Sequence, residues 1–194
     1  MTAQYAPARE PRWWLRPAGS VVAAYLIVLI IGILLLLLPI AKVGEGGATF
    51  MEAAFTATSV VCVTGLSVVD TATYWTGFGQ GVIFLLCELG GLGVMTLTTL
   101  VVLGVSHRIG LRQRMSVSAE SGVGPGMIKG VVRLVLGMAL VCQSVIAVLL
   151  TLRWWLHYDY GFGEALWLGI FHAGSAFNNL GFALFSDNLM GFTT

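Results

Sequence analysis

Charged residues are scarce in this sequence. Only 10% of the 194 residues are Asp, Glu, Lys or Arg, whereas 57% are hydrophobic; a soluble domain carries about 25% charged residues. The net charge of +1 provides no field that would attract a polyanion. The composition therefore argues against a nucleic-acid-binding protein, a disordered regulator and a water-soluble enzyme.

Cysteine is also rare. The three copies, Cys62, Cys87 and Cys142, lie in apolar stretches and form no CxxC or Cys/His pattern. We therefore expect neither a disulfide framework nor a structural zinc site, and no covalently bound cofactor. Glycine, in contrast, is abundant at 25 residues, which is typical of chains whose membrane helices pack closely or whose backbone approaches an ion.

Three long apolar runs predict membrane-crossing helices. The first, residues 20–41, would extend about 33 Å as a helix, enough to cross a bilayer. Arginines precede it, as in a signal peptide, but the run is too long and no small-residue cleavage site follows Pro39. The second run covers residues 78–105, and the third covers residues 127–155 and is entered near Val131. The sequence thus predicts an all-α membrane protein.

Two further apolar segments are too short to cross a membrane alone. Residues 50–63 lie between the first two long runs, and residues 161–182 follow the third. Each leads into glycine-containing sequence, which favours a re-entrant hairpin. The alternative, surface helices in extracellular loops, explains the length of these segments but not their apolar character.

Positive charge predicts the orientation of the chain. Eight of the ten Lys and Arg residues precede the first long run or lie between the second and third; the other two are Lys42 and Arg153. Because cytoplasmic loops are enriched in Lys and Arg, we expect a cytoplasmic N-terminus in a multi-pass protein of the plasma (inner) membrane. Only a hairpin that returns to its own side within residues 43–77 gives this arrangement.

The sequence contains a weak internal repeat. A shift of 116 residues aligns the two short segments and pairs identical residues: Phe55 with Phe171, Ala57 with Ala173, Ser59 with Ser175, and Gly65 with Gly181. Each unit reads as a membrane helix, a short half-helix and an irregular segment. We therefore expect parallel repeats of helix, re-entrant pore loop and helix, with the second repeat truncated.

The half-helices and the segments after them suggest a cation path. Thr49 and Glu52 form a T-x-x-E capping box at the outer end of the first half-helix, whose C-terminal end then points toward the bilayer centre and favours a cation. In residues 61–65, carbonyl oxygens freed from helical bonding at membrane depth can replace the water shell of an ion. The same reasoning applies to residues 177–181.

Three motifs resemble those of the Trk/Ktr/HKT superfamily of potassium transporters, most closely the TrkH-like membrane subunits of its bacterial Ktr group. They are CVTGLSVVDT at residues 62–71, GGLGVMT at residues 90–96 and FHAGSAFNNLGF at residues 171–182. The resemblance implies four helix–pore-loop–helix repeats around one path, each with a key filter glycine. It implies a K⁺ filter formed mainly by the backbone carbonyls of Cys62, Val63, Thr64, Gly65, Asn178, Asn179, Leu180 and Gly181.

The resemblance also implies partners. K⁺ would be the transported ion, and either Na⁺ or H⁺ is open as a coupling ion. Members of the superfamily are commonly homodimers within membrane lipid. They pair with cytoplasmic nucleotide-binding ring subunits of the regulator-of-potassium-conductance type, and no nucleic-acid partner is expected.

The sequence departs from the family pattern at three points. Cys62 replaces the usual threonine, and Glu88 stands where an uncharged polar residue such as glutamine is expected. The sequence stops soon after the second filter segment, so we expect an N-terminal fragment or truncated product. Its expected parts are a cytoplasmic segment (1–19), a first repeat (20–106), a cytoplasmic linker (107–127) and an incomplete second repeat (128–194).

Three acidic residues have two interpretations each. Asp70 and Asp187 follow the two filter segments, where they would concentrate cations at the mouth of the path or cap the next segment. Glu88 would be an acid of the ion path or a structural group, and the sequence favours neither. His172 is expected to be a structural hydrogen-bonding residue. The glycines around Gly90 are expected to permit close helix packing rather than to form a hinge.

Potassium uptake, as the ion-translocating subunit, is the leading function. A membrane-embedded enzyme would need convergent catalytic groups, but Glu88, His107 and His172 share no motif or spacing. A non-transporting scaffold, or an inactive truncated product, is the remaining alternative. It leaves the repeated re-entrant segments without a reason.

Overall fold

The regular structure of the chain is helical. A computed structural model describes residues 17–109 and 125–192, and within these ranges the named elements are all helices, which confirms the expected all-α class. In chain order the elements are α1 (Pro17–Leu36), the 3₁₀ turn η2 (Pro39–Ala41), α2 (Phe50–Val61), α3 (Thr71–Tyr74), α4 (Gly77–Ile109), α5 (Pro125–His157), α6 (Phe162–Phe177) and the 3₁₀ turn η5 (Met190–Phe192). The expected cytoplasmic segments 1–19 and 107–127 lie mostly outside the described residues.

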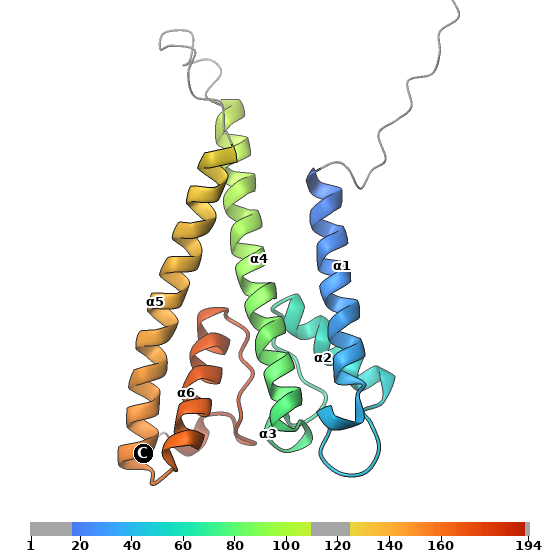
Figure 1. Cartoon of the computed structure of the whole chain (residues 1–194), viewed down its shortest axis with the longest axis vertical. Coiled ribbons are helices and arrows are strands. Elements are labelled where there is room, and N and C mark those ends of the chain that lie inside the picture. Colours follow the sequence, from blue (N-terminus) through green and yellow to red (C-terminus); the bar gives the residue numbers. More distant parts are fainter. Residues whose placement is uncertain (1–16, 110–124, 193–194) are drawn as a thin grey trace, which may run out of the picture.

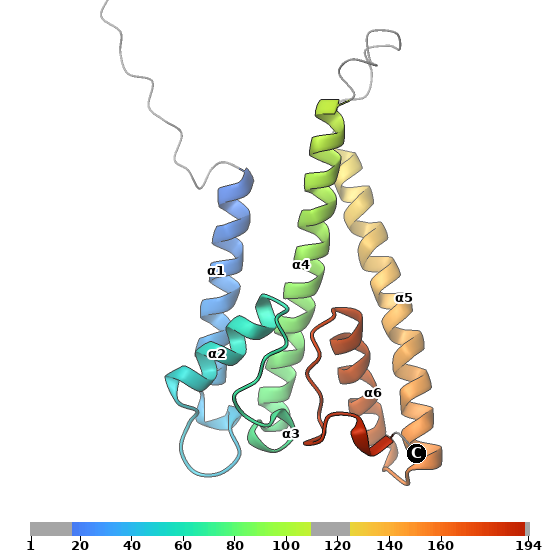
Figure 2. The same ribbon diagram turned by 180° about the vertical axis from the view of Figure 1, so that it is seen from behind.

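Three long helices and two short ones make up the architecture. α1 and α5 run in one direction, and α4 runs between them in the other (Figures 1 and 2). The short helices α2 and α6 lie toward the end of the molecule where α1 and α5 finish. α2 packs on α1 and α4, and α6 packs on α5 and α4. α4 therefore joins the two helix pairs.

Two of the three expected membrane spans meet the length requirement within the described residues. Gly77–Val94 in α4 and Val132–His157 in α5 are long and apolar enough to cross a membrane, whereas the shorter Val22–Leu36 represents α1. The prediction of a helix through residue 41 was wrong, because α1 ends at Leu36. Pro39 lacks a backbone donor and disfavours helical geometry at the residue before it, so a 3₁₀ turn follows instead.

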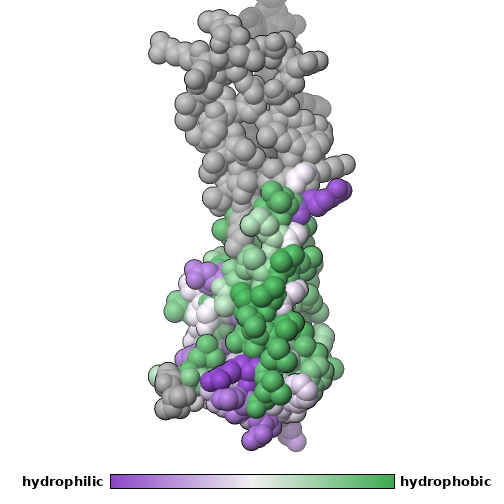
Figure 3. Space-filling model, turned by 90° about the vertical axis from the view of Figure 1, so that its left-hand side faces the viewer, coloured by the Kyte–Doolittle hydropathy of each residue, from purple (hydrophilic) through white to green (hydrophobic). Residues whose placement is uncertain are grey.

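The outer faces of the long helices are apolar. Figure 3 looks onto the side of the molecule formed by α5, where hydrophobic residues form a broad band and hydrophilic ones gather toward one end. Large exposed side chains on this helix include Leu134, Leu140, Val148 and Leu156. A continuous apolar surface of this kind is unusual on a water-soluble monomer and is typical of contact with lipid or with other membrane helices.

The core lies between the short helices and α4. α2 buries a row of small residues that includes Ala53 and Ala57, and α6 buries Phe171. Ile83 and Cys87 of α4 lie in the same cluster. Because both short helices pack on one helix, the loops that follow them start close together.

Candidate functional site

The first turn of α2 carries the expected capping box. The backbone N–H of Thr49 donates to the Glu52 carboxylate at 2.7 Å, and the N–H of Glu52 donates to Oγ1 of Thr49 at 3.4 Å. The hydroxyl of Tyr74, the last residue of α3, also donates to this carboxylate at 2.6 Å. The bond from Tyr74 is the largest cause that lowers the pKa of Glu52 to about 2. The acid therefore ties the start of α2 to the segment before α4.

The ends of α2 and α6 share one pattern of backbone hydrogen bonds. The N–H of Thr64 donates to the Ser59 carbonyl at 2.8 Å, and the N–H of Leu180 donates to the Ser175 carbonyl at the same distance. These donors and acceptors correspond under the shift of 116 residues. The two segments thus have the same local backbone hydrogen bond at these corresponding positions.

Both loops contain two residues in the left-handed region. Val63 and Asn179 have φ of 54° and 57°, and the glycines two positions later, Gly65 and Gly181, have φ of 77° and 82°. Glycine adopts this region freely, but a β-branched residue there is an outlier. Strained backbone of this kind concentrates at binding and catalytic sites.

Two serine hydroxyls, one in α2 and one in α6, form hydrogen bonds with the backbone of the loop that follows each helix. The N–H of Leu66 donates to Oγ of Ser59 at 2.9 Å, while Oγ of Ser175 donates to the Phe182 carbonyl at 2.7 Å. Ser59 and Ser175, which correspond under the shift of 116 residues, thus each bond the residue directly after a loop glycine, although the direction of the hydrogen bond differs. Hydrogen bonds therefore hold each loop both at the residue before its glycine and at the residue after it.

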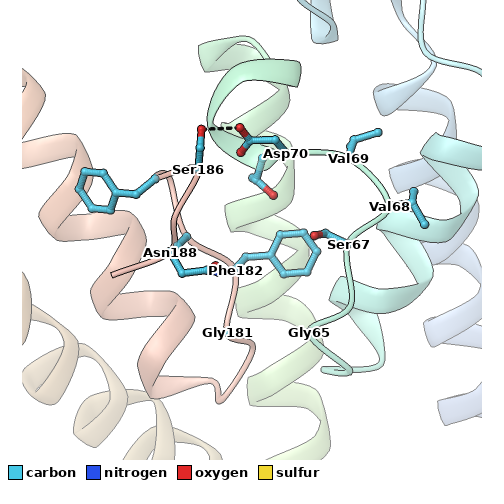
Figure 4. Close-up of a pocket in the computed structure, with 12 residues that line it drawn as sticks. Gly65, Ser67, Val68, Val69, Asp70, Gly181, Phe182, Ser186 and Asn188 are labelled. Carbon is cyan, nitrogen blue, oxygen red and sulfur yellow. Dashed lines mark hydrogen bonds between the residues drawn. The ribbon is translucent and has the colours of Figure 1, made fainter. Parts of the chain in front are cut away.

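The two loops face each other across a cavity of about 400 Å³, shown in Figure 4. Gly65 and Gly181 both line it. A β-carbon on Gly65 would clash with the backbone carbonyl oxygen of Leu180, so the first loop approaches the second too closely for any side chain. A β-carbon on Gly181 would meet no atom within 4 Å in the described structure.

Two adjacent glycines of α4 lie in close contact with the ends of α2 and α6, where the loops begin. A β-carbon on Gly90 would lie 2.5 Å from the carbonyl oxygen of Val61, at the end of α2. One on Gly91 would clash with the side-chain oxygen of Asn178, at the end of α6. The glycine motif therefore permits close packing of the loops on α4, as expected.

Asp70 lies at the cavity and also caps α3. Its carboxylate accepts from the backbone N–H of Ala72 at 3.0 Å and from the hydroxyl of Thr73 at 2.9 Å. The Ser186 hydroxyl, 116 residues further on, donates to the same carboxylate and is the main cause of a lowered Asp70 pKa. Asp70 therefore caps α3, which is one of its two expected roles, and also lines the cavity. Asp187 is not among the described residues that line the cavity.

Glu88 points toward α5 and α6. Its Oε1 accepts from the side-chain amide of Asn178 at 2.9 Å, and its Oε2 accepts from the amide of Gln143 at 3.1 Å. Gln143 was not predicted from the sequence as a partner of Glu88. Its amide side chain within an apolar run could have indicated such a contact, because polar groups in membrane helices usually bind polar partners.

His172 links α6 to the strand-like segment after its loop. Its Nδ1 bonds the Leu168 carbonyl at 2.8 Å, and its Nε2 accepts from the N–H of Leu184 at 3.2 Å. The histidine is buried and has the structural role that was expected. The residue that corresponds to His172 under the shift of 116 residues is Thr56, whose buried hydroxyl has no hydrogen-bond partner among the described residues.

The expected filter residues differ in exposure. Cys62, Thr64, Asn179 and Gly181 are exposed, whereas Asn178 and Leu180 are buried. No group of three or more His, Cys, Asp or Glu side chains that could hold a metal ion occurs among the described residues.

Comparisons with known proteins agree with the resemblance. Residues 19–194 match the TrkH family model, described as a cation transport protein. The chain is 40% identical over 182 residues to Ktr system potassium uptake protein B of Bacillus subtilis, covering 92% of this chain and 40% of that protein. It is 36% identical over 182 residues to potassium/sodium uptake protein NtpJ of Enterococcus hirae, covering 91% and 39%.

A third relative, Ktr system potassium uptake protein B of Vibrio alginolyticus, is 36% identical over 173 residues, covering 89% of this chain and 37% of that protein. The chain thus spans about two-fifths of the length of these relatives. The family match nonetheless covers nearly all of the chain, including both loops and the glycines of α4. The chain belongs to the TrkH family of cation transport proteins.

Proposed function

We propose that the chain is part of the ion-translocating subunit of a potassium uptake system. In this proposal, residues 62–65 and 178–181 form two parts of a K⁺ selectivity filter lined mainly by backbone carbonyls. The duplicated construction of the two loops supports it most directly. Each follows a half-helix, contains a left-handed residue and then a left-handed glycine, and faces the other loop across one cavity.

The proposal gives α2 and α6 the role of re-entrant pore helices. Both are too short to cross a bilayer, and both end next to the loops. The C-terminal end of a helix carries partial negative charge, which favours a cation between the loops. Asp70 adds a negative charge on the same cavity. In this arrangement α1, α4 and α5 cross the plasma (inner) membrane and the N-terminus is cytoplasmic.

The partners follow from the family. The names of two of the relatives place them in a Ktr system. For this chain we propose the assembly that the family resemblance implies, which is a homodimer in lipid with a cytoplasmic nucleotide-binding ring subunit. The family pattern has four filter segments, of which residues 17–192 supply two. A complete filter then requires two more segments. K⁺ is the proposed substrate, and the choice between Na⁺ and H⁺ as a coupling ion is open.

The experiment is potassium uptake by the protein expressed from its complete reading frame. Bacterial cells that lack their own potassium uptake systems should grow at low K⁺ when they produce it, and proteoliposomes that contain it should take up K⁺ in preference to Na⁺. Protein-free liposomes are the control. An inserted, folded protein that moves neither ion would instead support the scaffold alternative. Preferential uptake of Na⁺ would contradict the assignment of substrate.

A further inference from the structure

Glu88 is the single acidic residue in the sequence of α4, and it lies within the apolar stretch Gly77–Val94. Its side chain is half-buried and is not among the described residues that line the cavity between the loops. An acidic group in such a segment is costly unless it is paired or useful.

The partners of Glu88 are both donors. The side-chain NH₂ of Asn178 donates to Oε1 of Glu88 at 2.9 Å and also to the Gly174 carbonyl at 3.0 Å. Because a carbonyl can only accept, this second bond fixes the orientation of the Asn178 amide. The NH₂ of Gln143 donates to the other carboxylate oxygen at 3.1 Å. Both carboxylate oxygens of Glu88 therefore have an amide partner.

Neither hydrogen-bond partner that the structure describes for Glu88 carries a positive charge. Its two hydrogen-bond partners, Asn178 and Gln143, are neutral amides. A charge in a medium of low dielectric constant is unfavourable without an opposite charge nearby. A cation between the loops is the charge that the proposed function provides.

Asn178 connects the carboxylate to the proposed filter. Its side chain is bonded to Glu88, and its backbone belongs to the second filter segment. Its side-chain oxygen lies against Gly91, where no β-carbon can be accommodated, so the residue is held between α4 and its own helix. The carboxylate therefore lies directly behind the filter segment.

We propose that Glu88 is a positioning residue that holds Asn178 from behind the filter and supplies the fixed negative charge that raises the affinity of the filter for K⁺. This inference rests on the proposed function, because it requires an ion at the second loop. At an effective dielectric constant of about 20, one unit charge about 12 Å away changes the affinity for a cation by about tenfold, and a nearer charge changes it more.

The test separates charge from hydrogen bonding. In Glu88→Gln, the new amide can accept from Asn178 and donate to Gln143 after the Gln143 amide turns over, so the contacts survive while the charge is lost. The half-saturating K⁺ concentration for uptake should rise about tenfold, by the Coulomb estimate above, with the maximal rate and the K⁺/Na⁺ preference little changed. The matched control is Glu164→Gln, which removes an exposed charge from the first turn of α6 and should leave uptake unchanged.

A charge-exchange variant provides the second arm. Combining Glu88→Gln with Gln143→Glu returns a carboxylate to the same contact, and the half-saturating concentration should return toward that of the wild type. A role in packing alone does not predict this rescue. Gly91→Ala keeps the charge but displaces Asn178, and it should lower the K⁺/Na⁺ preference instead.

The outcomes are distinguishable from failure of the proposed function. A wild-type protein that transports no K⁺ would contradict that function. A transporting wild type with an unchanged half-saturating concentration in Glu88→Gln would overturn the role of the charge. A defective Glu88→Gln that the exchange variant does not rescue would overturn it as well.

Discussion

At the scale of single residues, Gly65 is the position where the two loops approach most closely. Gly65→Ser introduces a β-carbon that clashes with the Leu180 carbonyl oxygen, at a φ of 77° that disfavours side chains. The strain of about 1–3 kcal/mol should displace that carbonyl and lower the K⁺/Na⁺ flux ratio more than it lowers expression. Paired K⁺ and Na⁺ fluxes at matched membrane abundance measure this effect.

The control for this variant is Cys62→Thr. Cys62 is exposed, and the substitution changes a side chain while it leaves the backbone carbonyl in place. The flux ratio should therefore stay close to that of the wild type. A larger change in Cys62→Thr than in Gly65→Ser would place the selective step away from Gly65.

The outer anchor of α2 predicts a dependence on pH. The folded-state pKa of Glu52, about 2, lies below its ordinary value of 4.5, so its contribution to stability is complete above pH 4.5 and is lost as the pH falls toward 2. Tyr74→Phe removes the largest cause of this shift. The difference in thermal midpoint between wild type and Tyr74→Phe should be constant from pH 7 to 5 and should shrink below pH 4.5.

Tyr160→Phe serves as the matched control, because the described structure records no hydrogen bond from the Tyr160 hydroxyl and its ring contact with Phe185 would remain. It should show no such dependence on pH. A Tyr74→Phe difference that grows toward acid pH would mean that Glu52 is not stabilised as a carboxylate.

Residue-level prediction from the sequence succeeded where the signal was local. The capping box of Thr49 and Glu52 depends on residues three positions apart, and both parts are present in the structure. The partners of Glu88 were not predicted, since Gln143 and Asn178 lie 55 and 90 residues away and meet it only through helix packing. A pattern along the chain contains no direct information about such contacts.

At the scale of elements, α4 determines where the loops lie. Gly90→Ala places a β-carbon 2.5 Å from the Val61 carbonyl oxygen and should push the end of α2 away. Overpacking of this kind costs about 1–3 kcal/mol, so the thermal midpoint in detergent should fall. Gly81→Ala, on the same helix, meets no atom within 4 Å and should be neutral or stabilising. Equal effects of the two substitutions would contradict the close packing of α2 on α4.

The three long and two short helices of the described residues followed from apolar length, but the short helix α3 and the end of α1 did not. The first apolar run continues through residue 41, whereas α1 ends at Leu36 because Pro39 interrupts backbone bonding. Hydropathy does not register this interruption, because Pro39 is flanked by Leu38 and Ile40. The close approach of the two loops was also not predicted from the sequence, since it depends on how three helices pack together.

At the scale of the whole molecule, the distribution of charge predicts the orientation. Arg112 lies outside the described residues, and the proposed topology places it in the cytoplasm. A cysteine at Arg112 should react with a membrane-impermeant thiol reagent only after the inner face is exposed, whereas a cysteine at Glu45 should react in intact cells. The parent protein, with its own three cysteines, gives the background to subtract. Labelling of Arg112→Cys from outside would reverse the topology.

The central claim is that the two loops line one cation path, and locating the cation tests it most directly. Thallium substitutes for K⁺ and scatters X-rays anomalously, so crystals of the protein from its complete reading frame, grown in a thallium salt, would show where the ion binds. The account predicts anomalous peaks beside the backbone oxygens of residues 62–65 and 178–181, with weaker occupancy in Glu88→Gln. Well-occupied thallium sites elsewhere in the membrane region, with none between the loops, would contradict it.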